Sequence, residues 1–126
     1  MLMSTGKKVL VIDDDVRIAR FVRSALTVAG YEVSTVHSGE KGLKMVQEKR
    51  PDAILLDIVM PGMNGFEVLR RLGKTVPVIA FSANPSMGAE ALRLGAADFM
   101  TKPFRPEELL NRVVRIVGEA PGPVDG

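Results

Sequence analysis

The chain has 126 residues, of which 46% are hydrophobic and 25% are charged, a size and composition typical of one globular domain. Its 17 basic and 15 acidic residues leave a net charge of only +2, so we expect no direct binding of nucleic acid. The absence of cysteine excludes disulfides and thiolate metal sites, and the single histidine, His37, excludes a multi-histidine metal site.

The first element predicted along the chain is an apolar strand at residues 9–12, which runs into the carboxylates of residues 13–15. Asp15 is a good N-cap for a helix that follows, and Gly30 marks the end of that helix. The apolar face of this helix is predicted from residues that recur at helical spacing: Ile18, Val22, Ala25 and Ala29.

The remainder of the chain repeats this alternation of strand and helix. Further strands are predicted at residues 31–36, 52–57, 76–82 and 97–101. Further helices are predicted at residues 39–49, 66–72, 86–94 and 106–117. The pattern predicts an α/β fold of the (βα)5 type, in which a doubly wound, five-stranded parallel sheet has helices on both faces.

Polar side chains follow four of the predicted strands, at the point where each strand ends. They are Asp13–Asp15, Asp57, Ser82 and Lys102. The carboxyl ends of parallel strands meet at one edge of the sheet, where open α/β sheets bind ligands. Two carboxylates about 4 Å apart repel by roughly 4 kcal/mol at an effective dielectric constant of about 20. We therefore expect Lys102 and a divalent ion such as Mg²⁺ among them, a combination suited to phosphoryl chemistry.

Four motifs lie at these strand ends in a fixed order. They are Val-Ile-Asp-Asp-Asp at 11–15, Leu-Leu-Asp-Ile-Val-Met-Pro-Gly-Met-Asn-Gly at 55–65, Val-Ile-Ala-Phe-Ser-Ala at 78–83 and Lys-Pro-Phe at 102–104. Through them, residues 7–117 resemble the receiver domain of two-component response regulators, in particular the chemotaxis-regulator-like members. The resemblance implies a flavodoxin-like sheet with strand order 2-1-3-4-5.

The resemblance also implies a role for each residue of the predicted site. Asp57 would be the phosphoacceptor, and Lys102 would contact the phosphoryl group. Asp14 and Asp57 would bind Mg²⁺ directly, Asp13 would act mostly through water, and the backbone carbonyl of Val59 would be a further ligand. Mn²⁺ is an alternative ion. A cis Lys102–Pro103 peptide bond is also implied.

Five positions would set the response to phosphorylation. Ser82 matches the switch hydroxyl, which is often a threonine in the family, and Ala83 is the small residue beside it. Phe99 matches the aromatic switch, often a tyrosine, although simple core packing would also explain this residue. Val59 and Asn84 would tune autodephosphorylation, and the apolar Val59 predicts a slow rate.

These roles predict a receiver that is phosphorylated by a histidine kinase or a histidine phosphotransfer protein. Phosphorylation would alter the face formed by residues 86–94, 97–101 and 106–117, which would bind a downstream target, an attached output domain or a second copy of the chain. The chain would catalyse only its own phosphorylation and slow autodephosphorylation. The alternatives are a Mg²⁺-dependent phosphohydrolase with an aspartyl nucleophile, whose Asp-x-Asp-x-Thr motif is incomplete here, and a pseudo-receiver that acts as a binding module.

The predicted domain comprises residues 1–118, with an ordered core at about 7–117. Residues 119–126 are rich in proline and glycine and predict a tail or the start of a linker, so the chain is either a stand-alone regulator or part of a longer one. No apolar run approaches the roughly 20 residues that span a bilayer, and residues 1–8 lack the apolar region of a signal peptide. A cytoplasmic protein without membrane attachment is expected.

Overall fold

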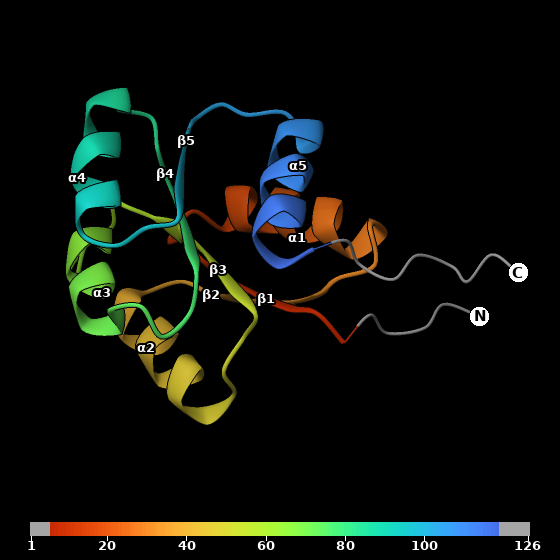
Figure 1. The fold of residues 1–126 in the computed structure, drawn as a ribbon, viewed down its shortest axis with the longest axis horizontal. Helices are drawn as coiled ribbons and strands as arrows, with labels where there is room; N and C mark the ends of the chain where they lie inside the picture. Colours follow the sequence, from red (N-terminus) through yellow and green to blue (C-terminus); the bar gives the residue numbers. More distant parts are fainter. Residues whose placement is uncertain (1–5, 119–126) are drawn as a thin grey trace, which may run out of the picture.

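Five parallel strands form a single sheet in the order β2-β1-β3-β4-β5 in the computed structural model, which describes residues 6–118 (Figure 1). The strands are β1 (Lys8–Ile12), β2 (Glu32–Val36), β3 (Ala53–Asp57), β4 (Val78–Ser82) and β5 (Asp98–Thr101). The predicted fold class and strand order are therefore confirmed. The proline- and glycine-rich segment predicted at 119–126 lies outside the described residues.

Helices cover both faces of the sheet, as predicted. They are α1 (Val16–Val28), α2 (Gly39–Glu48), α3 (Gly65–Leu72), α4 (Gly88–Arg93) and α5 (Pro106–Val117), and a 3₁₀ turn, η1 (Pro85–Met87), precedes α4. In Figure 1, α1 and α5 lie on one side of the sheet, and α2, α3 and α4 lie on the other. None of the helices at residues 6–118 is long and apolar enough to cross a membrane.

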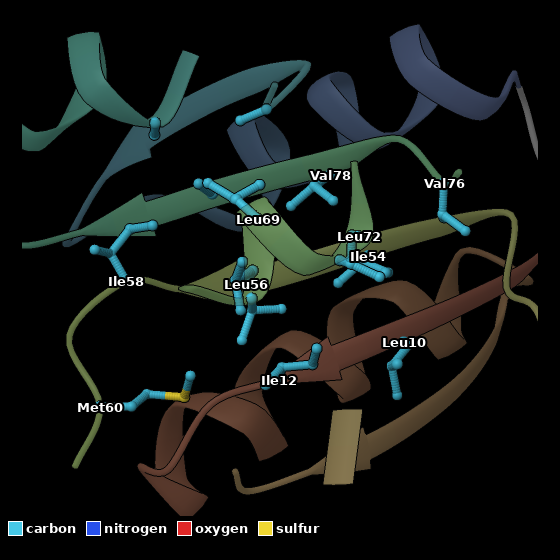
Figure 2. Packing of buried hydrophobic residues seen from close by; sticks show 14 residues of the cluster. Leu10, Ile12, Ile54, Leu56, Ile58, Met60, Leu69, Leu72, Val76 and Val78 are labelled. Carbon is cyan, nitrogen blue, oxygen red and sulfur yellow. The ribbon is translucent and has the colours of Figure 1, made fainter. Parts of the chain in front are cut away.

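Alternation along the strands divides the core into two layers. Leu10 and Ile12 of β1 face α2, α3 and α4 and belong to the hydrophobic cluster of Figure 2, which also contains Leu69 of α3. Val9 and Val11 belong to a second cluster with residues of α1 and α5. Every residue of β3 and β4 is buried, so these two inner strands have no solvent-exposed face and lie between the two layers.

The apolar face of α1 includes the predicted residues and is centred on a stripe that contains two further ones, Ala19 and Leu26. The buried residues are Ala19, Val22 and Leu26, at the spacing of one helical stripe. Of the other predicted positions, Ile18 and Ala25 are half-buried at the border of this stripe, and Ala29 is the C-cap that follows the helix.

The segment predicted as a helix at 86–94 is also divided. Pro85 begins the 3₁₀ turn, and the Asn84 side chain accepts a hydrogen bond from the Ser86 backbone N–H at 3.0 Å. This cap closes a tight first turn, so α4 itself begins only at Gly88.

Candidate functional site

The carboxylates predicted at the strand ends gather at one point of the sheet edge. Asp57 is the last residue of β3, and Asp13 follows β1, its neighbour in the sheet. One carboxylate oxygen from each of Asp13, Asp14 and Asp57 lies within 4.8 Å of the others. Oxygen ligands of this type suit a hard cation such as Mg²⁺ or Mn²⁺, so the cluster fits the predicted metal site.

Lys102 supplies the positive charge at this edge. Its Nζ lies 3.4 Å from Asp57 Oδ1 and 3.7 Å from Asp13 Oδ2, and 5.0 Å from the centre of the Phe81 ring. The backbone N–H of Lys102 donates to the carbonyl of Ser82 at 2.9 Å, which fixes the lysine to the neighbouring strand. The Lys102–Pro103 peptide bond is cis, as the resemblance implied.

Two of the three carboxylates are almost completely removed from solvent. Asp13 is 0% exposed and Asp57 is 4% exposed, whereas Asp14 is exposed. Burial raises the pKa of Asp57 to about 7, with a further increase from the nearby charge of Asp13, and the ammonium of Lys102 only partly offsets both effects. Burial likewise raises the pKa of Asp13.

Backbone contacts hold Asp13 in its buried position. Its N–H donates to the Val36 carbonyl at 3.1 Å, and its Oδ1 accepts the N–H of Asp15 at 2.8 Å. The other oxygen, Oδ2, is buried and accepts no hydrogen bond from the described residues. The nearest cation to this oxygen is Lys102 Nζ at 3.7 Å, so a desolvated oxygen without a hydrogen bond favours a further cation and supports the fit of the cluster to a divalent ion.

The predicted switch hydroxyl lies at the end of the next strand. Ser82 is the last residue of β4, is 1% exposed, and is paired with Thr101 in the register of β4 with β5. Its Oγ accepts the Asn84 N–H at 3.1 Å and donates to the Met87 sulfur at 3.4 Å. The structure therefore brings Ser82 to the predicted edge, with its hydroxyl bonded within its own loop.

The remaining predicted residues surround this centre. The backbone N–H of Val59 donates to Asp57 Oδ1 at 3.4 Å, while the Val59 side chain is 58% exposed. The Asn84 side-chain oxygen accepts the hydrogen bond from the Ser86 N–H that caps η1. Phe99 is half-buried on β5 and packs against the cluster of α2, α3 and α4.

Sequence reasoning missed two neighbours of the site. Met87 was predicted only as part of a helix, and its contact with Ser82 depends on the 3₁₀ turn that precedes α4. His37, the single histidine of the sequence, is exposed, but its Nδ1 lies 2.9 Å from the Asp13 carbonyl oxygen. Neither contact has a signal in the local sequence.

An apolar hollow of about 330 Å³ lies beside Lys102. Its walls come from α1, the end of β4 and the loop after β5, and are formed by Ile18, Phe21, Ala83, Pro103 and Phe104. Phe21 is 40% exposed, and its ring lies 6.2 Å from that of Phe104. Exposed apolar surface therefore adjoins the acidic cluster.

Comparison with known proteins agrees with this geometry. Residues 9–114 match the family model described as the response regulator receiver domain. The uncharacterized transcriptional regulatory protein YkoG of Bacillus subtilis is 42% identical over 110 residues, which cover 83% of this chain and 48% of YkoG. Response regulator MprA of Mycobacterium tuberculosis H37Rv is 39% identical over 111 residues, which cover 84% of this chain and 48% of MprA.

Solved structures show the same fold. The Vibrio cholerae chemotaxis protein CheY4 has a TM-score of 0.81 and 35% identity, with 87% of this chain and 98% of CheY4 covered. The receiver domain of the Francisella response regulator 1452 has a TM-score of 0.83 and 33% identity, with 89% and 97% covered. The chain spans about half the length of the curated relatives it matches. Because the family match extends from β1 into α5, the chain belongs to the response regulator receiver domain family of two-component systems.

Proposed function

We propose that this chain receives a phosphoryl group on Asp57 from a histidine kinase or a histidine phosphotransfer protein. The observation that carries the proposal is the Asp57 carboxylate itself, which is buried at the end of β3 within an acidic cluster and 3.4 Å from the Lys102 ammonium. An Asp57 oxygen forms the new bond to phosphorus, and the bond between phosphorus and the imidazole nitrogen of the donor breaks. The donor protein then leaves with an unphosphorylated histidine side chain. The family membership and the position of Asp57 on β3 favour this function over a phosphohydrolase.

Mg²⁺ is the cofactor that fits the cluster, and Mn²⁺ suits the same oxygen ligands. Asp14 and Asp57 would hold the ion directly, Asp13 would act largely through water, and the Val59 carbonyl would complete the protein ligands. When bound, the ion supplies positive charge that reduces repulsion between the carboxylates and the incoming phosphoryl oxygens.

The chain's own residues carry out the rest of the reaction. Lys102 is close enough to Asp57 to neutralise one phosphoryl oxygen as a point charge. Ser82 would donate a hydrogen bond to another oxygen after its hydroxyl turns away from its own loop. Because both interactions differ before and after transfer, they can shift the balance between two conformations.

The apolar hollow beside Lys102 offers the phosphoryl donor a place to dock. Phe21, which is 40% exposed, and Phe104 line this hollow together with Lys102, which pairs with Asp57 and Asp13 of the acidic cluster. Arg17 and Arg20, which immediately precede the lining residues Ile18 and Phe21 in α1, are exposed and would contact acidic groups of the donor.

The response would be read on the face of α4, β5 and α5. Ser82 and Phe99 would repack this face when the phosphoryl group arrives. It carries charges of both signs, for example Arg93 and Glu108, which suit a downstream protein or a second copy of the chain. Since YkoG and MprA are about twice as long as the matched segment, an attached output domain is a further partner of this face.

Phosphorylation in the presence of Mg²⁺ tests the proposal. Incubation with acetyl phosphate should add one phosphoryl group to the chain, detected by intact mass at neutral pH. Asp57→Asn should abolish the addition, while Asp52→Asn, a matched change at the exposed residue before β3, should leave it intact. Full labelling of the Asp57→Asn variant would disprove the assignment.

A further inference from the structure

The Ser82 hydroxyl has a defined partner for its only proton. Its Oγ accepts the N–H of Asn84 and donates to the sulfur of Met87 at 3.4 Å. These are the two side-chain hydrogen bonds of Ser82 among the described residues, and the side chain is 1% exposed. A hydroxyl has one proton, so the proton given to sulfur is withheld from any group on Asp57.

We propose that Met87 is a positioning residue that holds the Ser82 hydroxyl in its resting orientation and competes with the phosphoryl group for the hydroxyl proton. The inference rests on the proposed function, because the competing acceptor is a phosphoryl group on Asp57. A thioether is a weak acceptor and an anionic oxygen is a strong one. A change of acceptor, in which the Ser82 hydroxyl donates its hydrogen bond to the phosphoryl oxygen instead of to sulfur, is therefore favourable. The gain is smaller than it would be for a hydroxyl that had no acceptor before.

The turn before α4 places Met87 where it can do this. The Met87 N–H donates to the Asn84 carbonyl at 3.1 Å, and the Asn84 side chain caps the same turn. These bonds bring residue 87 back towards residue 82. The contact is therefore built by the 3₁₀ turn and would be lost if α4 began one turn earlier as a regular helix.

Met87 also adjoins the second predicted switch residue. A Cβ added to Gly88, the next residue, would lie 2.9 Å from the Phe99 ring, so the ring rests directly on the first residue of α4. Met87 and Phe99 both pack against the cluster of α2, α3 and α4. When the Ser82 hydroxyl no longer donates to the sulfur, the Met87 side chain must repack. Because Met87 directly precedes Gly88, on which the Phe99 ring lies, this repacking connects the end of β4 to β5.

Binding of beryllofluoride with Mg²⁺, a mimic of the phosphoryl group, tests this role in titrations of the whole chain followed by NMR. Met87→Leu keeps the side-chain volume and removes the acceptor, so it should bind beryllofluoride roughly two- to tenfold more tightly, the range expected for the loss of one competing hydrogen bond. Met87→Gln supplies a stronger acceptor and should bind more weakly. Met45→Leu, the same change at a half-buried methionine of the same cluster on α2, should not alter the affinity.

The effect must also depend on Ser82. In a Ser82→Ala background, Met87→Leu should leave the affinity unchanged. Equal affinities of wild type and Met87→Leu, a gain that persists without the Ser82 hydroxyl, or the same gain in Met45→Leu would each overturn the inference. If the wild-type chain itself failed to bind beryllofluoride, the proposed function would be contradicted, and this inference with it.

Discussion

Asp57 occupies a position in which a charged carboxylate is energetically costly. Burial and the neighbouring Asp13 raise its pKa from 3.8 to about 7, although Lys102 lies close by. A carboxylate whose folded-state pKa is raised contributes stability that is fully present below pH 3.8 and is lost as the pH rises through about 7. This cost favours the binding of a cation, because a positive charge at the cluster offsets both the burial of Asp57 and its repulsion from Asp13.

This pKa predicts how stability depends on pH in the absence of divalent ions. Asp57→Asn removes the titrating group, so the variant should gain stability relative to wild type as the pH rises from 4 to 8. Over this pH range, the difference in the free energy of unfolding between the variant and the wild type should change by on the order of 2–4 kcal/mol, because each unit of pKa shift corresponds to about 1.4 kcal/mol. Urea unfolding in EDTA at several pH values measures it, and a difference that stays constant with pH would contradict the raised pKa.

Val59 predicts how long the phosphoryl group persists. Its side chain is 58% exposed and cannot hydrogen-bond an attacking water molecule. We therefore expect slow autodephosphorylation, and Val59→Asn should accelerate it by providing a polar group. The rate follows from loss of the phosphorylated mass over time, with Val28→Asn on the exposed end of α1 as a matched control. Identical rates for wild type and Val59→Asn would argue against this role, and Asn84 would then be the residue to vary.

At the scale of elements, the start of α3 is pressed against the end of β3. A Cβ on Gly65 would lie 2.7 Å from the backbone oxygen of Asp57 and 2.7 Å from the Cα of Ile58. The Gly65 N–H also donates to the Ile58 carbonyl at 2.8 Å. The absence of a side chain at this position therefore allows α3 to pack closely against the strand that ends at Asp57, the proposed phosphoacceptor.

Gly65→Ala should accordingly affect both stability and chemistry. Overpacking against backbone should lower the free energy of unfolding by about 1–3 kcal/mol and displace Asp57, which would slow labelling by acetyl phosphate. Gly73→Ala is the comparison, because this residue caps the other end of α3 at φ +59° with open space around it. It should lose stability through its backbone conformation and keep the labelling rate. Equal labelling rates in the two variants would refute this role of the close packing.

Most of these elements could be predicted because their signals are local. The apolar runs ending at Asp57 and Ser82 gave the strands, and Gly30 and Pro106 marked helix boundaries. The parallel sheet then places the strand ends together without further information. What could not be predicted depends on contacts between elements.

The layer that each helix joins illustrates this limit. An apolar stripe such as that of α1 shows that a face is buried, but it carries no information about which face of the sheet the helix covers. The rotation of α1 that buries Ala19 and Leu26 is likewise decided by packing against α5 and the sheet. The link from Ser82 to Met87 requires a 3₁₀ turn, whose short hydrogen-bonding pattern resembles the beginning of a helix in sequence.

At the scale of the whole molecule, the acidic cluster joins strands from the middle of the sheet, so its repulsion acts on the entire fold. Mg²⁺ should therefore raise the melting temperature of the chain. An ion present at 100 times its dissociation constant adds about 2.7 kcal/mol to the free energy of unfolding. Asp14→Ala should abolish the increase, whereas Asp52→Ala, at an exposed carboxylate away from the cluster, should not. Identical melting curves of the wild type with and without Mg²⁺ would count against a metal site.

The sheet also separates the regions expected to respond to phosphorylation from those expected to remain still. Ser82 and Phe99 lie on β4 and β5, and Arg112 of α5 donates to the Asp98 carboxylate at 2.8 Å and the Phe99 carbonyl at 3.1 Å. A change at Ser82 can thus reach α4 through the turn before it and α5 through Arg112. On the other half of the sheet, β2 is separated from the strands of Ser82 and Phe99 by β1 and β3.

Amide hydrogen exchange with and without beryllofluoride should therefore show altered protection in η1, α4, β5 and the first half of α5, with β2 unchanged. Asp57→Asn, which removes the attachment point, should show no change in any of these elements. The Arg112 contacts provide a sharper comparison, since Arg112→Met should confine the response to η1 and α4 while leaving beryllofluoride binding in place. Changes restricted to the loop after Asp57 in the wild type would mean that the phosphoryl signal does not reach this face.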